Sequence, residues 1–218
     1  MKKSNIFEVY ENRDRIYTEN LTPRKTVYTE RLFKDGGIEY REWDARKSKL
    51  GAAIKKGSPN VGIRKGDVVL YLGASTGTTV SHVSDMVGKD GLVFALDFAP
   101  RVIRELVFVA QERKNVVPII ADANNIDSFK DRISEADVIF MDIAQKNQAE
   151  IFLKNVKAFL KKDGYALLAV KAKSVNIARK PKAIFNEIRE ELKKEVTIID
   201  FRTLEPFELD HCIFICKG

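Results

Sequence analysis

From Asp67 to the end of the chain, short apolar segments rich in β-branched residues alternate with amphipathic segments of helix length. This alternation is typical of α/β domains, in which parallel strands form a sheet and the intervening helices cover both of its faces. We therefore predict a doubly wound sheet in this part of the chain. The expected strands are Val68–Leu72, Leu92–Leu96, Val117–Ile120, Val138–Met141 and Tyr165–Val170, and the expected helices are Thr78–Val87, Pro100–Glu112, Gln148–Leu160 and Pro181–Lys194.

The end of the chain departs from this alternation. Two further apolar runs, Val196–Phe201 and Cys212–Ile215, are separated by a connection, Thr203 to Asp210, that is too short for a helical crossover. The final strand should therefore pair antiparallel with its predecessor. Together with the five expected parallel strands, this hairpin makes a seven-stranded sheet with a reversed last strand.

The first fifty residues follow a different pattern. Short segments of alternating polarity, such as Phe7–Tyr10 and Ile38–Trp43, are interrupted by Pro23 and by Gly36-Gly37. Such segments are typical of a small antiparallel sheet. We expect a small N-terminal β domain at residues 1–50 and a main domain at residues 51–218.

The charge of the chain is unevenly distributed. There are 38 Lys and Arg against 31 Asp and Glu, a net charge of +7, and the whole excess falls in residues 1–65, most densely between Asp44 and Lys65. A second stretch, Lys171 to Lys182, contains cations and no carboxylate. Clustered cations favour a polyanionic partner such as nucleic acid. A solvated surface rich in Lys and Glu, as in thermophilic proteins, explains the charge alone equally well.

Cysteine content and hydropathy indicate the compartment. Cys212 and Cys216 are too few for a disulfide framework, and their spacing of four places both on one face of a strand, where we expect buried thiols and no metal site. No apolar stretch reaches the roughly 18 residues of a membrane-spanning helix, and the first residues lack the apolar segment of a signal peptide. We expect a soluble, cytoplasmic protein with no membrane partner.

The first expected strand runs into a glycine-containing turn, Gly73-Ala74-Ser75-Thr76-Gly77, and a helix follows. In doubly wound folds this turn lies at the carboxyl edge of the sheet, where ligands bind, so Gly73, Ala74 and Gly77 are candidate ligand contacts. The spacing departs from the dinucleotide pattern G-x-G-x-x-G, and no lysine follows Gly77 as a P-loop requires. The turn therefore disfavours binding of a nucleotide phosphate.

Three other expected strands lead into an aspartate: Asp97, followed by Phe98; Asp122; and Asp142. A carboxylate at this edge can accept hydrogen bonds from ribose hydroxyls, and Phe98 could lie against a base. A strand-end Asp is also often only a helix cap. Three of them beside a glycine turn favour a nucleoside pocket. A nucleoside ligand without phosphate, on a seven-stranded sheet with a reversed last strand, indicates S-adenosylmethionine.

Three runs, at residues 69–85, 137–145 and 204–211, resemble the fibrillarin family. The string Gly-Thr-Thr-Val-Ser-His-Val-Ser-Asp at residues 77–85 is the most specific of them, and the resemblance covers nearly the whole chain. It implies a Rossmann-like class I S-adenosylmethionine-dependent methyltransferase fold and an RNA 2′-O-methyltransferase of box C/D ribonucleoprotein particles, acting on rRNA and by extension tRNA. Without the Gly- and Arg-rich tail of eukaryotic members, the chain is similar to the archaeal ones.

The resemblance also assigns site residues. Asp97 stands where the family usually has Glu, and a shorter carboxylate can still reach a ribose. Lys171 could act as the general base or as an orienting group, because Lys49 and the donor sulfonium would lower its pKa while Asp142 would raise it. The implied donor contacts are Thr78, Thr79, Asp97, Phe98, Asp122, Ala123, Asp142, Ile143, Ala144 and Gln145. The implied catalytic residues are Lys49, Asp142, Lys171 and His211.

The two basic stretches flank this catalytic edge. Lys47, Lys55, Arg179 and Lys180 are therefore candidate contacts to RNA phosphates. The implied partners are a box C/D guide RNA, its target RNA, a Nop-family scaffold protein and a kink-turn-binding subunit that resembles a ribosomal protein. Two alternatives stay open: a subunit that binds donor and scaffold without turnover, and a guide-independent RNA 2′-O-methyltransferase.

Overall fold

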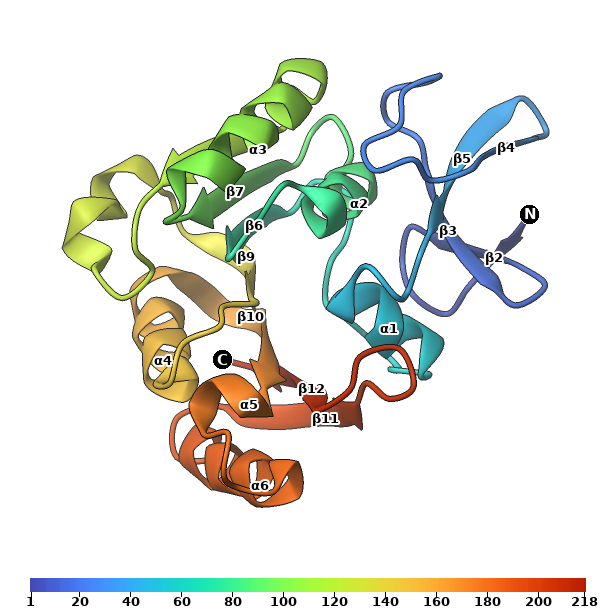
Figure 1. Ribbon diagram of the computed structural model, residues 1–218. Helices are drawn as coiled ribbons and strands as arrows, with labels where there is room; N and C mark the ends of the chain where they lie inside the picture. Colours follow the sequence, from blue (N-terminus) through green and yellow to red (C-terminus); the bar gives the residue numbers. More distant parts are fainter.

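The apolar runs after residue 67 form the seven-stranded sheet expected from the sequence (Figure 1). The computed structural model describes residues 1–218. The strand order is β11-β12-β10-β9-β6-β7-β8, and every pairing is parallel except the two made by β12. The prediction of a reversed last strand is confirmed. The strands are β6 (Val68–Leu72), β7 (Leu92–Asp97), β8 (Val116–Ile120), β9 (Ala136–Met141), β10 (Leu160–Lys171), β11 (Thr197–Thr203) and β12 (His211–Lys217).

The chain changes direction at the centre of this sheet. From β6 it proceeds outward through β7 to β8, and then returns to place β9 and β10 on the other side of β6. The connections after β6 and β9 therefore diverge to opposite faces. Such a switch point leaves a crevice at the carboxyl ends of the strands, and it is where open α/β sheets bind ligands.

Most of the helices match the sequence pattern. Proline occupies the first helical position of α3 and α6. Its fixed φ suits a helix, and the N–H that it lacks would have no acceptor within the helix at this position. Helix α4 ends at Phe159, one residue earlier than expected, because the chain enters β10 directly at Leu160. Two short helices were not expected, α1 (Lys49–Lys55) and α5 (Ala172–Val175). The others are α2 (Thr78–Val87), α3 (Pro100–Glu112), α4 (Gln148–Phe159) and α6 (Pro181–Leu192), with 3₁₀ turns at Ile126–Ser128 and Lys130–Arg132.

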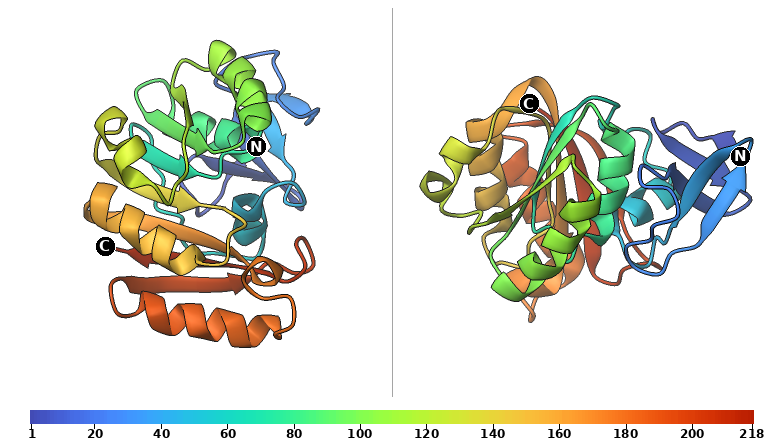
Figure 2. Two further views of the ribbon diagram at one scale, coloured as in Figure 1. Left: turned by 60° about the vertical axis from the view of Figure 1, so that its left-hand side comes forward. Right: turned by 90° about the horizontal axis from the view of Figure 1, so that it is seen from above.

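Helices cover both faces of the sheet (Figure 2). One hydrophobic cluster joins one face to residues of α1, α2 and α3, and a second joins the opposite face to α4 and α6. Cys212 and Cys216 are both buried in the second cluster, which confirms the prediction of buried thiols on one face of a strand. None of the helices combines the length and the hydropathy needed to cross a membrane.

The N-terminal residues form a separate antiparallel sheet of five strands in the order β1-β2-β3-β5-β4, as the sequence predicted. Ile16 and Trp43 from this sheet belong to the same hydrophobic cluster as Val83 of α2, so the two sheets are joined by a continuous core. Helix α1 spans the expected domain boundary at residue 50. The strands are β1 (Lys2–Lys3), β2 (Val9–Asn12), β3 (Arg15–Glu19), β4 (Leu32–Asp35) and β5 (Ile38–Trp43).

Candidate functional site

A cavity of about 250 Å³ opens at the switch point of the large sheet. Its walls come from the segments that follow β6, β7, β8 and β9, so the carboxyl ends of four strands contribute to it. Nine of its twelve lining residues are ones the sequence nominated as ligand contacts. The lining residues are Gly73, Ser75, Leu96, Asp97, Phe98, Ala121, Asp122, Ala123, Asp142, Ile143, Ala144 and Gln145.

The turn after β6 has left-handed backbone at Gly73, Ser75 and Gly77, with φ of 86°, 50° and 94°. A Cβ on Gly73 would lie 2.2 Å from the carbonyl oxygen of Asp142, so only glycine lets the ends of β6 and β9 approach this closely. Gly77 faces α3 instead, where a Cβ would lie 3.0 Å from Leu106. The two glycines thus bring the protein's own segments together around the cavity.

Asp97 is held by the turn it faces. Its Oδ2 accepts a hydrogen bond from the Ser75 N–H at 2.9 Å, and its Oδ1 accepts one from the Ala99 N–H at 3.0 Å. An ionised carboxylate has about four lone-pair positions, so about two remain for a ligand. Asp122 similarly accepts from the Asn124 N–H at 2.9 Å. Neither aspartate caps a helix, because the N-caps of the following helical segments are Ala99 and Asn125 and neither segment has a side-chain cap. The bonds instead orient the two carboxylates at the cavity.

Phe98 stands at the rim of the cavity with 68% of its surface exposed. A large apolar ring so exposed beside three carboxylates lacks a protein partner of its own. Its aromatic face can stack on a flat heterocycle.

Asp142 connects the cavity to the cationic part of the chain. Its Oδ2 lies 2.9 Å from the Nζ of Lys49, and each side chain is 20% exposed. Lys49 is the first residue of α1, a helix that the sequence pattern did not predict. The structure thus brings together two of the four nominated catalytic residues as an ion pair at the edge of the cavity.

His211 and Lys171 are directly opposite each other where β12 pairs with β10. Directly opposite residues of antiparallel strands project from the same face. The His211 Nδ1 lies 2.6 Å from the carbonyl oxygen of Leu209. A carbonyl only accepts, so Nδ1 carries the proton and the Nε2 of neutral His211 has a free lone pair.

Burial lowers the pKa of His211 below its ordinary 6.5, the hydrogen bond to Leu209 opposes this, and the charge of Lys49 lowers it further while Glu208 and Asp142 raise it. His211 is therefore neutral at pH 7. That Lys49 and Asp142 both act on this imidazole places three of the nominated catalytic residues in one neighbourhood. Lys171 is exposed and forms no salt bridge.

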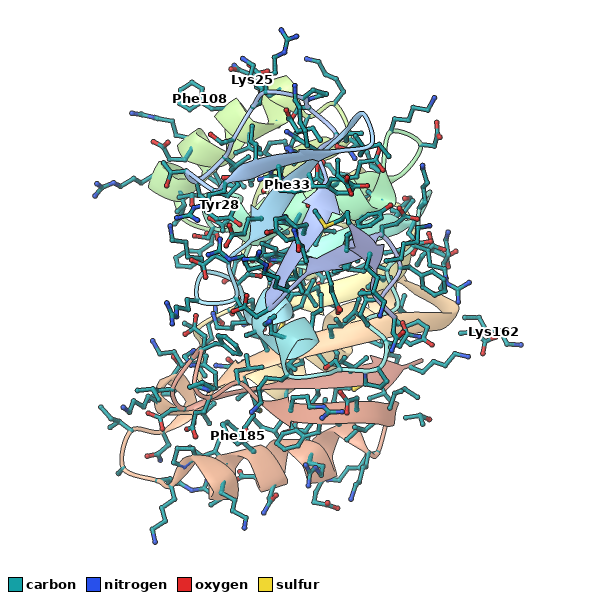
Figure 3. The ribbon with its side chains drawn as sticks, turned by 90° about the vertical axis from the view of Figure 1, so that its right-hand side faces the viewer. Lys25, Tyr28, Phe33, Phe108, Lys162 and Phe185 are labelled. Carbon is teal, nitrogen blue, oxygen red and sulfur yellow. The ribbon has the colours of Figure 1, made fainter.

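Other nominated donor contacts lie outside the cavity. Ala74 is buried and Gly77 packs on α3. Thr78 lines a second cavity of about 480 Å³, together with Lys25, Tyr28 and Phe108, between the loop that joins β3 to β4 and helix α3. Figure 3 labels Lys25, Tyr28 and Phe108. The Thr79 hydroxyl donates to Ser48 Oγ at 3.0 Å.

The four candidate phosphate contacts are dispersed. Lys47 lies 5.4 Å from the centre of the Tyr28 ring, and Lys55 donates to the carbonyl of Asp14. Arg179 pairs with Glu187 at 2.6 Å, and Lys180 precedes α6 on the exposed loop after α5.

Sequence reasoning missed Ser75, Leu96 and Ala121 in the cavity, and Ser48 at the start of α1. Ser75 and Ala121 lie in the turns beside nominated residues, and Ser75 acts through its backbone N–H, which no side-chain pattern reveals. Ser48 did carry a signal, because serine just before an apolar helical run is a preferred N-cap.

The second half of the most specific string serves the interface between the two sheets. Thr18 of β3 donates to Asp85 Oδ2 at 2.7 Å, so its oxygen accepts from the Nδ1 of His82 at 2.8 Å. That leaves the His82 Nε2 to accept from the Tyr28 hydroxyl at 2.6 Å. His82 also stacks on Trp43, with ring centroids 4.6 Å apart. His82 and Asp85 therefore dock the N-terminal sheet onto α2.

A seven-stranded α/β sheet with a reversed final strand and a ligand cavity at its switch point defines the fold class of S-adenosylmethionine-dependent methyltransferases. The Fibrillarin family model matches residues 1–218. A fibrillarin-like rRNA/tRNA 2′-O-methyltransferase of Thermococcus onnurineus is 44% identical over 212 residues, which cover 97% of this chain and 94% of the relative. The chain belongs to the fibrillarin family, and the resemblance found in the sequence is confirmed.

Solved structures agree with this assignment. Fibrillarin of Aeropyrum pernix, crystallised with natively bound S-adenosyl-L-methionine, superposes with a TM-score of 0.90 at 38% identity, covering 99% of this chain and 96% of that one. The fibrillarin chain of a fibrillarin/Nop5p complex also gives a TM-score of 0.90, at 34% identity and with 98% and 99% of the two chains covered.

Proposed function

We propose that this chain transfers a methyl group from S-adenosylmethionine to the 2′-oxygen of ribose in RNA. The observation that carries the proposal is the position of Asp142, which lines the cavity and also forms the ion pair with Lys49. One carboxylate thus belongs both to a nucleoside-sized pocket and to the cationic edge beside it. A donor and a polyanionic acceptor would meet at that residue.

The residues of the cavity fit the donor. The lone pairs left on Asp97 suit ribose hydroxyls, and the exposed ring of Phe98 suits adenine. Ligand pockets usually have volumes of roughly 300 Å³ or more, and this cavity has about 250 Å³. A bound nucleoside would therefore stay partly exposed to solvent. S-adenosylmethionine, when bound, supplies a methyl group on a positively charged sulfur.

The chain's own groups account for the handling of the proton. The free Nε2 of neutral His211 is the group best prepared to accept the proton of a 2′-hydroxyl, because its Nδ1 proton is fixed on Leu209. Lys171, exposed and opposite His211, is placed to orient the acceptor oxygen or a neighbouring phosphate. The ion pair of Lys49 with Asp142 fixes a positive and a negative charge at the edge of the cavity, where the methyl transfer would take place. We thus assign Lys171 as the orienting group and His211 as the base.

The basic stretches support an RNA partner. Lys173, which pairs with Asp210, and Lys180 follow β10 in the chain, while Lys47 and Lys55 lie on either side of Lys49 in the sequence. Phosphates favour such clusters through counterion release. By kinship with the fibrillarin of the Nop5p complex, we propose a Nop-family scaffold as protein partner. We further propose a box C/D guide RNA and a kink-turn-binding subunit to select the target.

The test is methyl transfer to an RNA complementary to a guide, measured with and without the guide RNA and its proteins. We expect transfer only with the complete particle, at the nucleotide that the guide selects. Equal transfer without the particle would instead establish a guide-independent enzyme. Donor binding with no transfer under either condition would establish a structural subunit.

A further inference from the structure

Ser48 occupies an unusual position between α1 and α2. Its Oγ accepts the Gly51 N–H at 3.1 Å and so caps the start of α1. The same oxygen accepts the Thr79 hydroxyl, from the second residue of α2, at 3.0 Å. Ser48 is 3% exposed and Thr79 is 9% exposed, so water cannot easily replace either bond. One hydroxyl therefore joins the beginnings of two helices.

Thr79 is itself fixed to the body of the protein. It is a buried residue in the first turn of α2, which packs against β7 and against β3 of the N-terminal sheet. Hydrogen bonds therefore run from the first turn of α2 through Ser48 to the first turn of α1.

Helix α1 depends on such an anchor. It has seven residues and no acidic side chain in its first turn. Helices this short are marginal in water without tertiary contacts, so a serine N-cap contributes a large share of their stability. Lys49 is its first residue, immediately after Ser48, and its Nζ lies 2.9 Å from the carboxylate of Asp142, the residue that follows β9.

We propose that Ser48 is a positioning residue, whose buried hydroxyl fixes the start of α1 to Thr79 and thereby holds Lys49 on Asp142. The effect on methyl transfer rests on the proposed function, but the effect on Lys49 itself does not. Misplacement of a reacting constellation by about 1 Å can cost about 10²-fold in rate. Thr79, which the resemblance assigns to donor contact, acquires a second role as the residue of α2 that holds Ser48.

The direct test measures the reactivity of the Lys49 amine. The full-length protein is treated with a limiting amount of acetic anhydride, and mass spectrometry compares acetylation of Lys49 with that of exposed Lys162. In Ser48→Ala we expect Lys49 to be acetylated several-fold faster relative to Lys162, because the amine spends more time away from Asp142. Ser48→Thr, which retains the hydroxyl, should restore the slow rate. Thr79→Val, which keeps the Ser48 cap but removes its donor, should also accelerate acetylation.

Ser58→Ala is the matched control. Ser58 is 4% exposed, lies just beyond the other end of α1, and donates to Asp200 at 2.9 Å without contacting Thr79 or Lys49. The Ser58→Ala substitution removes a comparable buried hydroxyl and should leave the acetylation of Lys49 unchanged. Thermal melts of each variant exclude global unfolding. Unchanged acetylation of Lys49 in folded Ser48→Ala and Thr79→Val, or an equal increase in Ser58→Ala, would overturn the proposal.

Kinetics in the assembled particle separate this proposal from the proposed function. We expect Ser48→Ala to lower kcat about tenfold or more at unchanged KM for the donor, with rescue by Ser48→Thr. If wild type itself transfers no methyl group, the proposed function fails while the acetylation result still decides the role of Ser48. If Ser48→Ala does not fold, Thr79→Val decides the same question. Equal kcat in Ser48→Ala and wild type would count against the role.

Discussion

Arg41 of β5 and Asp85 of α2 form an ion pair of 2.7 Å in which neither side chain is exposed. The other oxygen of Asp85 lies 2.6 Å from Arg113, and the Nε of Arg41 donates to Glu30 at 2.7 Å. Two guanidinium groups and two carboxylates thus balance each other at the junction of the two sheets. Buried charges are tolerated only when they are paired and hydrogen-bonded.

Asp85→Asn should destabilise the protein by about 3–5 kcal/mol, because it leaves two buried guanidinium groups without their shared carboxylate. Urea unfolding monitored by circular dichroism measures the change. Asp90→Asn, at an exposed position just beyond α2, is the control and should have little effect. A loss below about 1 kcal/mol in Asp85→Asn, within the range of exposed ion pairs, would contradict the importance of this junction.

The free energy of unfolding should fall as the pH is lowered from 7 to 5. Burial lowers the pKa of His82 well below its ordinary 6.5, so the unfolded chain binds a proton that the folded chain excludes. Stability therefore decreases as the pH falls through 6.5 and continues to decrease toward the folded pKa, by at most about 1.4 kcal/mol per pH unit for each such histidine. The lowered pKa of His211 adds to the same trend.

Urea titrations at several pH values test this expectation. The chain has two histidines, so His211→Gln should retain the contribution of His82, whereas His82→Gln should be less stable at pH 7 but vary less with pH. Stability that stays constant or rises between pH 7 and 5 in wild type would show that His82 is not held neutral.

The rate of methyl transfer should rise with pH through the lowered pKa of His211, below 6.5, and level off by about pH 7. The reason is that Nε2 accepts a proton only in the neutral imidazole. Single-turnover transfer in the assembled particle, with donor saturating, measures the profile. His211→Gln should lose this rise, and a rise that persists in this variant would assign the proton acceptor to another group.

Lys171→Ala should reduce methyl transfer by about 10²-fold or more, because the acceptor oxygen would lose the group that orients it. Donor affinity should stay nearly unchanged, because Lys171 lies outside the donor cavity. Calorimetric titration with the donor and transfer assays measure the two quantities. Lys162→Ala, at the other end of β10, is a control of the same size and charge. Parallel losses of donor affinity and transfer would reject a catalytic role for Lys171.

Gly51→Ala should destabilise the protein by about 1 kcal/mol although alanine favours helices. A Cβ at this position would lie 2.8 Å from the Nε1 of Trp43, and Trp43 is 2% exposed and cannot easily move. Overpacking costs about 1–3 kcal/mol, more than the roughly 1 kcal/mol gained in helix propensity.

A double-mutant cycle with Trp43→Phe provides the check, because phenylalanine lacks the part of the indole that the new methyl group would meet. Gly51→Ala should be less damaging in the Trp43→Phe background. Equal losses in both backgrounds would place the strain elsewhere.

The sequence by itself determined the large sheet, its reversed last strand and the edge where the cavity lies. Hydrophobic periodicity and the prolines at Pro100 and Pro181 are local signals, and parallel strands end at one edge, so Asp97, Asp122 and Asp142 had to converge. The short helix α1 was not predicted, because seven residues give too little periodicity to distinguish a helix from a loop.

Only the tertiary structure decided which side chains meet. Lys49 and Asp142 are 93 residues apart, and their ion pair exists because α1 packs against α2 and β12 and so brings Lys49 to the segment that follows β9. His82 and Asp85 belong to the string most typical of the family, yet they contact the N-terminal sheet rather than the cavity. A sequence pattern predicts on which face of a helix or strand a residue lies. Its hydrogen bonds and ion pairs depend on which residues the tertiary structure places opposite that face.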